Sequence, residues 1–359
     1  MSGGQFGRNL AVKTVPLFSS SSCRPAAILK LIYMRPLHLL GCLFWVIGRL
    51  AAQQDPTLTT YHFNALMFNP AYAGSHEHLT LNLTHRHQWL GFEDAPVTQV
   101  FSGHMPLKND RVGLGLTLLN DQAGPGGVTD LSGAYAYRLK LGAQEQFKLS
   151  LGLQAGIANW RSRLSSVKVE DTDDPSFAQN LSRWLPNFGA GAYLYGKQFY
   201  AGLGIPRLLE YDLSSSTGNE GQIQAKNLRH WYLTAGAALP LQGQQLGFRP
   251  NLLLQHAGLL SSNGPLRAGA PASLNLGASF LFRQLFWAGA TYRTALARNS
   301  SHDSANMWVS WSLRNGLRFG AAYDITLSKL RNASNNSFEI MLGYEFDVKV
   351  KQVVSPRYF

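Results

Sequence analysis

The strongest constraint on the fold is an alternation of apolar with small or polar residues at a period of two. It is most regular in four segments, 129–141, 147–157, 272–282 and 338–346. Successive side chains of an extended strand point to opposite faces. Each segment therefore predicts a strand with one apolar face and one small or polar face.

The same pattern recurs along most of the chain and predicts about 14 strands, an even number that is typical of bacterial outer-membrane barrels. Strands of about ten residues match the length that a tilted strand needs to cross a membrane. The expected strands are 78–90, 98–108, 111–122, 128–141, 147–163, 185–196, 198–208, 229–241, 247–258, 272–283, 285–295, 304–315, 317–327 and 337–348.

Turn lengths separate a membrane barrel from a soluble two-sheet protein, in which strands would alternate in the same way. Tight connections are expected at 108–111, 196–198, 283–284 and 315–316, and longer ones at 164–184, 209–228 and 257–271. Outer-membrane barrels have short periplasmic turns and longer extracellular loops. We therefore predict an all-β, antiparallel transmembrane outer-membrane β-barrel, with the soluble two-sheet protein as the alternative.

Hydropathy agrees with this prediction. The mean hydropathy is −0.10 although charged residues make up only 14% of the chain. Beyond the N-terminal region no run of about 20 apolar residues predicts a transmembrane helix. A barrel alternates apolar and polar positions, so its hydrophobicity is hidden from window averages.

The N-terminal region has the pattern of a targeting segment. Arg35 precedes an apolar stretch, 37–48, and the small residues Ala51 and Ala52 follow it. The stretch is too short to span a membrane comfortably, which favours a cleaved signal peptide over a signal anchor. The expected organisation is a start-site extension without structure (1–33), a signal peptide (34–52), a periplasmic segment leading into the barrel (53–77), the barrel (78–348) and a C-terminal tail (349–359).

Cleavage changes the charge and the thiol content. Residues 1–52 carry six basic and no acidic residues, so removing them lowers the formal net charge from +12 to +6. Cys23 and Cys42 leave with them, which excludes cysteine catalysis and a thiolate metal site in the mature chain. The remaining basic residues form no block, so no nucleic-acid partner is expected.

The predicted inward face combines glycines with scattered charges. Across a closed lumen these charges would pair with one another or contact a loop folded inside, or they would hydrate a water-filled lumen; all of these possibilities stay open. The glycines are Gly113, Gly115, Gly152, Gly156, Gly189, Gly191, Gly202, Gly204, Gly289 and Gly320, and the charges are Arg86, Arg138, Lys140, Lys148, Arg293, Arg314, Arg318, Asp324, Glu339 and Glu345.

Catalytic and metal-binding patterns are weak. His85 and His87 lie two apart but share a strand face with leucines, which favours a membrane-interface position over a metal site. His104 near Ser102 is the best hydrolase pair, and the chain has no Gly-x-Ser-x-Gly elbow. The acidic run 171–174 lacks the ligand spacing of an EF-hand. We expect neither enzymatic activity nor a cofactor or metal.

Several motifs resemble the PorP/SprF family of the Bacteroidetes type IX secretion system. The most specific pair is 68–75 (FNPAYAGS) with 86–92 (RHQWLGF). The resemblance implies an outer-membrane barrel that works with surface-exported proteins in secretion, surface attachment or gliding. Further matching pieces are 95–98, 113–115, 120–121, 124–125, 135–138, 322–324, 339–342 and 355–359.

The motif residues are candidates for structure and interaction rather than catalysis. Asn69, Pro70 and Gly74 are expected to shape the segment before the barrel, with docking as the sharper alternative. Arg86 is expected on the polar face and Trp89 in an interfacial girdle. The full candidate set is Asn69, Pro70, Tyr72, Gly74, Arg86, Gln88, Trp89, Pro96, Asn120, Asp121, Arg138, Asp324, Arg357 and Phe359.

The resemblance implies two kinds of protein partner, an exported surface protein with a C-terminal sorting domain and other type IX secretion components. The barrel fold adds outer-membrane lipid as a third contact. Two alternatives from other classes remain, a porin or solute channel without a protein client and a barrel hydrolase.

Overall fold

The computed structural model describes residues 55–107, 110–142, 145–166, 180–213, 226–242, 245–258, 271–296, 302–328 and 336–346. The expected N-terminal extension, the signal peptide, the acidic run 171–174 and the C-terminal tail with Arg357 and Phe359 lie outside these residues.

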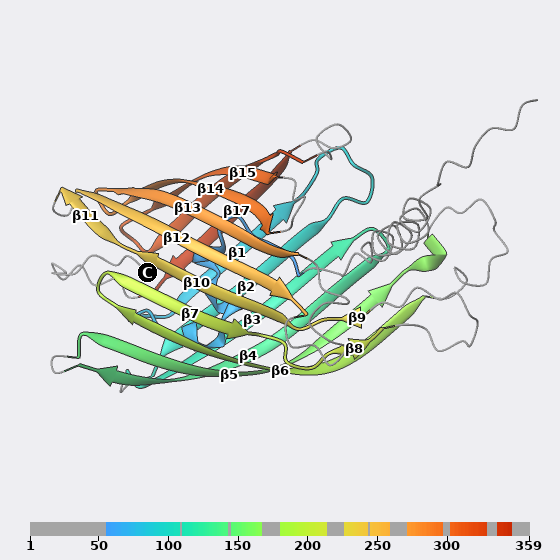
Figure 1. Ribbon diagram of the computed structural model, residues 1–359, viewed down its shortest axis with the longest axis horizontal. Coiled ribbons are helices and arrows are strands. Elements are labelled where there is room, and N and C mark those ends of the chain that lie inside the picture. Colours follow the sequence, from blue (N-terminus) through green and yellow to red (C-terminus); the bar gives the residue numbers. More distant parts are fainter. Residues whose placement is uncertain are drawn as a thin grey trace, which may run out of the picture. The chain divides into compact units, whose positions relative to one another are not determined.

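The described strands form one closed antiparallel barrel (Figure 1). Its sheet contains 15 strand segments, but β10 and β11 both pair with β12 and are two pieces of one wall strand, which gives a ring of 14. The ring strands are β1 (Thr80–His87), β2 (Val97–Pro106), β3 (Val112–Ala123), β4 (Gly126–Leu141), β5 (Phe147–Ser162), β6 (Leu181–Gly196), β7 (Phe199–Ile205), β10 (His230–Ala237) with β11 (Leu239–Gln242), β12 (Leu246–Ala257), β13 (Ala272–Phe282), β14 (Phe286–Leu296), β15 (His302–Ser312), β16 (Leu317–Thr326) and β17 (Ser337–Glu345).

Closure takes place between the first and last strands. Leu83 of β1 lies opposite Phe101 of β2 on one side and opposite Leu342 of β17 on the other. The break in the eighth wall strand lies at Ala238, whose backbone N–H donates to the carbonyl oxygen of Gln198 at 2.7 Å. The predicted outer-membrane barrel of 14 strands is confirmed.

Strand boundaries differ from the prediction at two informative places. β1 ends at His87 rather than at residue 90, because Trp89 has a φ of 48° and leaves the extended conformation. Trp89 therefore lies in the loop after β1 and not on a strand face. β6 begins at Leu181, four residues before the expected start, so β4, β5 and β6 each have 16 residues.

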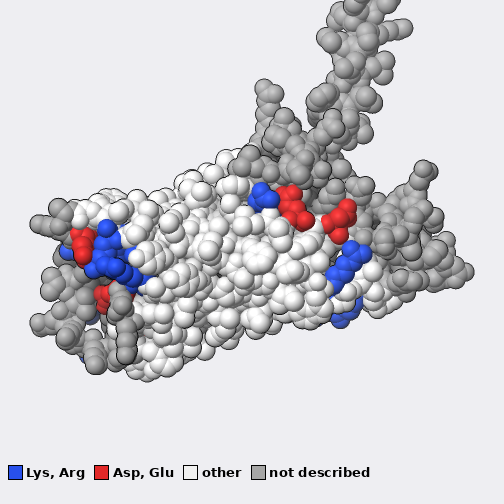
Figure 2. All heavy atoms as spheres, turned by 90° about the horizontal axis from the view of Figure 1, so that it is seen from below, with Lys and Arg blue, Asp and Glu red and all other residues white. Residues whose placement is uncertain are grey.

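The two faces of the wall follow the predicted alternation. Leu153 and Leu276 point outward and are 66% and 46% exposed, whereas Ser150 and Ser279 point inward and are fully buried. Figure 2 shows that the charged side chains on one face of the molecule gather toward its two ends and leave an uncharged band between them. Such a band is the surface that a barrel presents to the hydrocarbon of a bilayer.

The two ends of the barrel differ in their connections. The short-turn end carries the connections 107–111, 142–146, 197–198, 243–245, 283–285 and 313–316, and the long-loop end carries 88–96, 163–180, 206–229, 258–271, 297–301 and 327–336. One connection at the long-loop end, Gly124-Pro125, is short because β3 and β4 themselves extend. In an outer-membrane barrel the short turns are periplasmic and the long loops extracellular.

Several of the charges expected inside the barrel lie at the short-turn end instead, among them Lys140 and Arg314. Lys140 is near the last residue of β4 and pairs at 2.6 Å with Glu145 of the following turn. Arg314 lies in the exposed turn between β15 and β16. Both positions have the inward parity of their strand but lie where the wall ends.

Three short helices precede β1. They are η1 (Tyr61–Phe63), α2 (Ala65–Phe68) and η2 (Pro70–Tyr72). A two-residue ribbon, β8 (Tyr211–Asp212) with β9 (Lys226–Asn227), lies in the connection between β7 and β10, and η3 (Leu164–Ser166) follows β5. Among the described residues no helix is long and apolar enough to cross a membrane.

Candidate functional site

The segment before β1 lies inside the barrel. We call residues 55–76 the lumen segment; Figure 1 shows it in blue, enclosed by the strands. Its apolar side chains are as buried as those of a protein core, with Leu58 and Phe68 each 1% exposed and Ala71 fully buried. Its polar Asn64 is also fully buried, and its side chain donates to the Thr84 hydroxyl of β1 at 2.9 Å.

The fold of the lumen segment follows from its Asn-Pro sequence. The side chain of Asn69 accepts a hydrogen bond from the backbone N–H of Ala71 at 2.9 Å and so caps η2. Pro70 occupies the first helical position, where its missing N–H is no loss. Gly74 then has a φ of +66°, a left-handed conformation that suits glycine and turns the chain toward β1.

Glycines of the wall make room for this segment. A Cβ at Gly152 of β5 would overlap the backbone of Ala71, and one at Gly204 of β7 would overlap the carbonyl oxygen of Phe68. Glycine is the residue that permits so close an approach of two backbones. We call this surface the glycine wall; it also includes Gly113 of β3, packed against Ala73, and Gly191 of β6, packed against Asn69.

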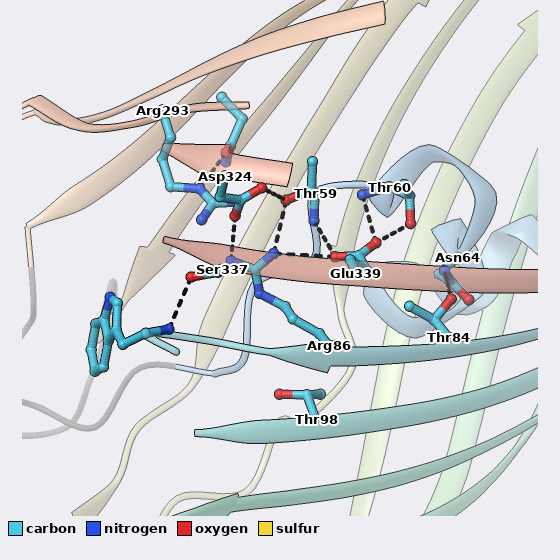
Figure 3. Close-up of polar contacts among 12 residues, drawn as sticks. Thr59, Thr60, Asn64, Thr84, Arg86, Thr98, Arg293, Asp324, Ser337 and Glu339 are labelled. Atoms are coloured by element: carbon cyan, nitrogen blue, oxygen red, sulfur yellow. Dashed lines mark hydrogen bonds and ion pairs between the residues drawn. The ribbon is translucent and has the colours of Figure 1, made fainter. Parts of the chain in front are cut away.

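The start of the lumen segment is bound by a buried ionic cluster (Figure 3). Arg86 of β1 pairs with Asp324 of β16 at 2.5 Å and with Glu339 of β17 at 3.2 Å. Both acceptors also bind the lumen segment, because the backbone N–H groups of Thr59 and Thr60 donate to the two Glu339 oxygens at 2.8 and 3.0 Å. The Thr59 hydroxyl donates to Asp324 and accepts from Arg86. This arrangement joins three strands and the segment in one network.

A second ionic cluster binds Asp55, at the start of the lumen segment. The carboxylate of Asp55 pairs with Arg207, which follows β7, and accepts a hydrogen bond from the Tyr232 hydroxyl at 2.8 Å. Arg207 also lies 3.7 Å from Asp130 of β4. Burial raises the pKa of Asp55, but Arg207 and His230 outweigh this effect, so the pKa is lowered. Asp55 is therefore an anion fixed by its neighbours.

The two clusters place the lumen segment along the barrel. Arg86 is the second-last residue of β1 and Glu339 lies near the start of β17, both at the long-loop end. At its other end, Gly74 contacts Gly113 at the start of β3 and the carbonyl oxygen of Met105 near the end of β2, at the short-turn end. The segment therefore runs through the lumen from the long-loop end to the short-turn end.

Two other inward candidates, Arg138 and Asp121, form hydrogen bonds within the wall. Arg138 donates from Nε to the carbonyl oxygen of Asp110 and from a terminal nitrogen to that of Val112, both at 2.7 Å, and so supports the β2–β3 turn. Asp121 accepts from the Thr98 hydroxyl at 2.6 Å. These contacts join neighbouring parts of the wall and are structural.

The remaining candidates gather at the long-loop end. The backbone N–H of Gln88 donates to the carbonyl oxygen of Pro96 at 2.9 Å, which closes the β1–β2 loop. The backbone N–H of Trp89 donates to the side-chain oxygen of Ser337 at 3.1 Å. The side chain of Asn120 lies on the outer face of β3, where it donates to Gln99 at 3.3 Å.

Sequence reasoning missed part of the site. The inward alternation places Arg86, Asp324 and Glu339 on one face, so the first cluster is within reach of the sequence. Asp55 and Arg207 lie outside every strand, in a polar lead and after a proline, where no periodicity operates. Nothing local in the sequence indicates that these two residues meet.

Ser102 and His104, the best hydrolase pair in the sequence, contact the lumen segment. Ser102 and His104 are both buried on the inner face of β2, and the Ser102 hydroxyl donates to Asn64 at 3.4 Å. The His104 ring packs edge-on against Tyr72 and His76, with centroids 5.2 and 5.0 Å apart. Within the described residues no cluster of His, Cys, Asp or Glu could hold a metal ion.

The fold defines a transmembrane barrel of the bacterial outer membrane, and sequence comparison agrees with this class. The family model described as type IX secretion system membrane protein PorP/SprF matches residues 50–344. The chain belongs to this family. No curated protein matches the sequence.

Solved structures of similar shape are outer-membrane proteins of low identity. A Pseudomonas aeruginosa FadL homologue is 12% identical, with 84% of this chain and 96% of that chain covered and a TM-score of 0.44. The CymD monoaromatic hydrocarbon channel is 14% identical at the same coverage, with a TM-score of 0.45. The barrel assignment itself rests on the strand pairing described above.

Proposed function

We propose that this barrel binds or guides an exported surface protein of the type IX secretion system at its long-loop end. The family is associated with type IX secretion. The family and the barrel fold are both non-enzymatic in kind. The expected client carries a C-terminal sorting domain, and other secretion components would meet the short-turn end. No catalytic role is proposed.

The observation that carries the proposal is the occupied lumen. Buried ionic clusters bind the start of the lumen segment, and the glycine wall fits its end. A pore for solutes needs a water-filled path, as in porins. An occupied lumen therefore supports a binding role and gives no support to the alternative of a solute channel.

An affinity capture tests the proposal. A tag is inserted in the β4–β5 turn, where the flanking Gly142 and Glu145 are exposed. The barrel is then recovered from crosslinked outer membrane and its partners are identified by mass spectrometry. We expect a large exported protein with a sorting domain, or secretion components, to be recovered.

Two controls sharpen the capture. A tagged barrel of unrelated family, expressed at the same level, reports non-specific recovery. If this barrel is recovered alone after crosslinking and conducts solutes into liposomes, the binding role is wrong and the solute channel replaces it.

A further inference from the structure

A cavity opens on the outer surface of the barrel near the long-loop end. Its volume is about 400 Å³, and the β1–β2 loop forms one side of it while β2 and β3 form the other. Its lining includes His87, Phe92, Asp94, Gln99, Asn120 and Gln122. We call it the rim pocket. Its volume lies within the range of small-ligand sites, roughly 300–1,000 Å³.

The strand register fixes the height of the rim pocket. One row of outward side chains is apolar and runs from Leu83 through Phe101 and Leu118 to Leu131. The next row toward the long-loop end is polar and consists of His85, Gln99, Asn120 and Thr129. The pocket thus begins one residue pair beyond the lipid-facing belt, at the level of the outer-leaflet headgroups.

The polar row is held in place by its own hydrogen bonds. Arg161 donates to the side-chain oxygens of Asn120 and Thr129 at 3.2 and 2.8 Å. Asn120 in turn donates to the side-chain oxygen of Gln99 at 3.3 Å. Two amides of the pocket therefore have fixed orientations before any ligand arrives, which lowers the entropy cost of binding.

The loop over the pocket is strained and pinned. Trp89 and Asp94 have φ values of 48° and 56°, which are rare for residues other than glycine. Backbone hydrogen bonds hold the loop near both residues. The N–H of Leu90 donates to the carbonyl oxygen of Asn336 at 3.1 Å, and the N–H of Gly124 donates to that of Asp94 at 3.0 Å. Strain of this kind concentrates at ligand clamps.

The chemistry of the lining selects the ligand. The oxygen of Asn120 already accepts from Arg161 and Thr129, so this amide offers only its remaining N–H. The amides of Gln99 and Gln122 offer donors and acceptors, and Asp94 accepts from hydroxyl groups. The ring of Phe92 is 53% exposed and offers a flat apolar surface. The described lining contains no lysine or arginine, and the adjacent Arg161 is engaged with Asn120 and Thr129, which disfavours a bare phosphate. Amides, one carboxylate and one aromatic ring together suit the hydroxyls and the apolar face of a sugar ring.

We propose that the rim pocket binds a sugar ring of an outer-leaflet glycolipid. The pocket faces sideways at headgroup height, so the leaflet itself brings such a ring to it. The site is independent of the client-binding role and would tether the long-loop end to the surrounding glycolipid.

Native mass spectrometry of the barrel in nanodiscs tests the proposal. The probe is rough lipopolysaccharide mixed into phosphatidylethanolamine, and phosphatidylglycerol replaces it as the sugar-free anionic lipid. The test variant is Gln99→Leu/Gln122→Leu, which keeps outward strand positions apolar and removes two amides. Phe92→Ala is a second variant in the loop, and Thr294→Leu on the outer face of β14 is the matched control.

We expect the wild type and Thr294→Leu to retain lipopolysaccharide about tenfold more than the double variant, the effect of losing two hydrogen bonds. Phe92→Ala should also weaken retention. The proposal is wrong if the double variant and Phe92→Ala both retain lipopolysaccharide like the wild type. It is equally wrong if phosphatidylglycerol is retained as well, or if delipidated core oligosaccharide binds fully without the leaflet.

Discussion

The lumen segment meets two kinds of wall. Its later part, from Phe68 to Gly74, lies against the glycine wall. The wall positions have no side chains there, so the backbone of the segment packs directly against the backbone of the wall. Its earlier part meets charged and hydrogen-bonding side chains, above all Arg86 and Glu339. Shape fixes the first contact and charge fixes the second, so the two should fail under different perturbations.

The largest effect is expected from the charged contact. Arg86→Met leaves two buried carboxylates without their shared cation, which should lower the free energy of unfolding by about 3–5 kcal/mol. Thermal unfolding in detergent measures the loss. Arg318→Met is the control, because the Arg318–Glu345 pair is less buried, with side chains 15% and 17% exposed. An Arg86→Met barrel as stable as the control would show that the cluster does not hold the segment.

The glycine wall should respond to added volume. Gly152→Val places a side chain where the Ala71 backbone lies and should cost about 1–3 kcal/mol or more. Gly133→Val is the matched control, since a Cβ there meets nothing within 4 Å. Chemical unfolding compares the two variants. Equal stability of both would mean that the segment does not pack against Gly152.

Acid should weaken the charged contact and leave the glycine contact unchanged. The folded-state pKa of Asp55 is lowered, so its contribution is present above the unfolded value of about 3.9 and is lost as pH falls toward the folded value. Hydrogen exchange of residues 57–60 should therefore rise below about pH 4 before that of residues 71–73. Asp55→Asn should reduce this pH dependence, while the contacts of Glu339 with Thr59 and Thr60 remain; an unchanged profile in the variant would exclude Asp55 as a cause.

The smallest effect is expected where a charge pair lies outside the lumen. Lys140→Gln breaks an exposed pair with Glu145 and should change stability by less than about 1 kcal/mol. Thermal unfolding of Lys140→Gln and Arg86→Met under the same conditions compares the two losses of stability. A loss as large as that of Arg86→Met would mean that burial does not separate the two kinds of contact.

The wall of this barrel can be predicted from its sequence, and the path of the lumen segment cannot. Period-two alternation fixes which side chains of a strand share a face, and it places Ser132 and Arg138 inward and Leu131 outward as the structure has them. The same alternation turns the glycines of β5 to β7 inward, but the reason for glycine at these positions appears only with the backbone that packs against them.

Residues 55–76 carry no periodicity that a sequence argument can use. Their Asn-Pro and Gly positions indicate turns, and turns alone do not distinguish a segment outside the barrel from one inside it. The contact between Asp55 and Arg207 joins residues far apart in the chain, neither of which lies in a strand. Such pairings depend on the closed barrel and have no local signal.

Hydrogen–deuterium exchange of the folded barrel in detergent, followed at residues 56–73, tests the central claim most directly. An occupied lumen predicts that these backbone amides exchange as slowly as those of the surrounding strands, because ionic clusters and the glycine wall shield them. Complete exchange at the earliest time point, with the wall strands still protected, would place the segment outside the barrel and contradict the account.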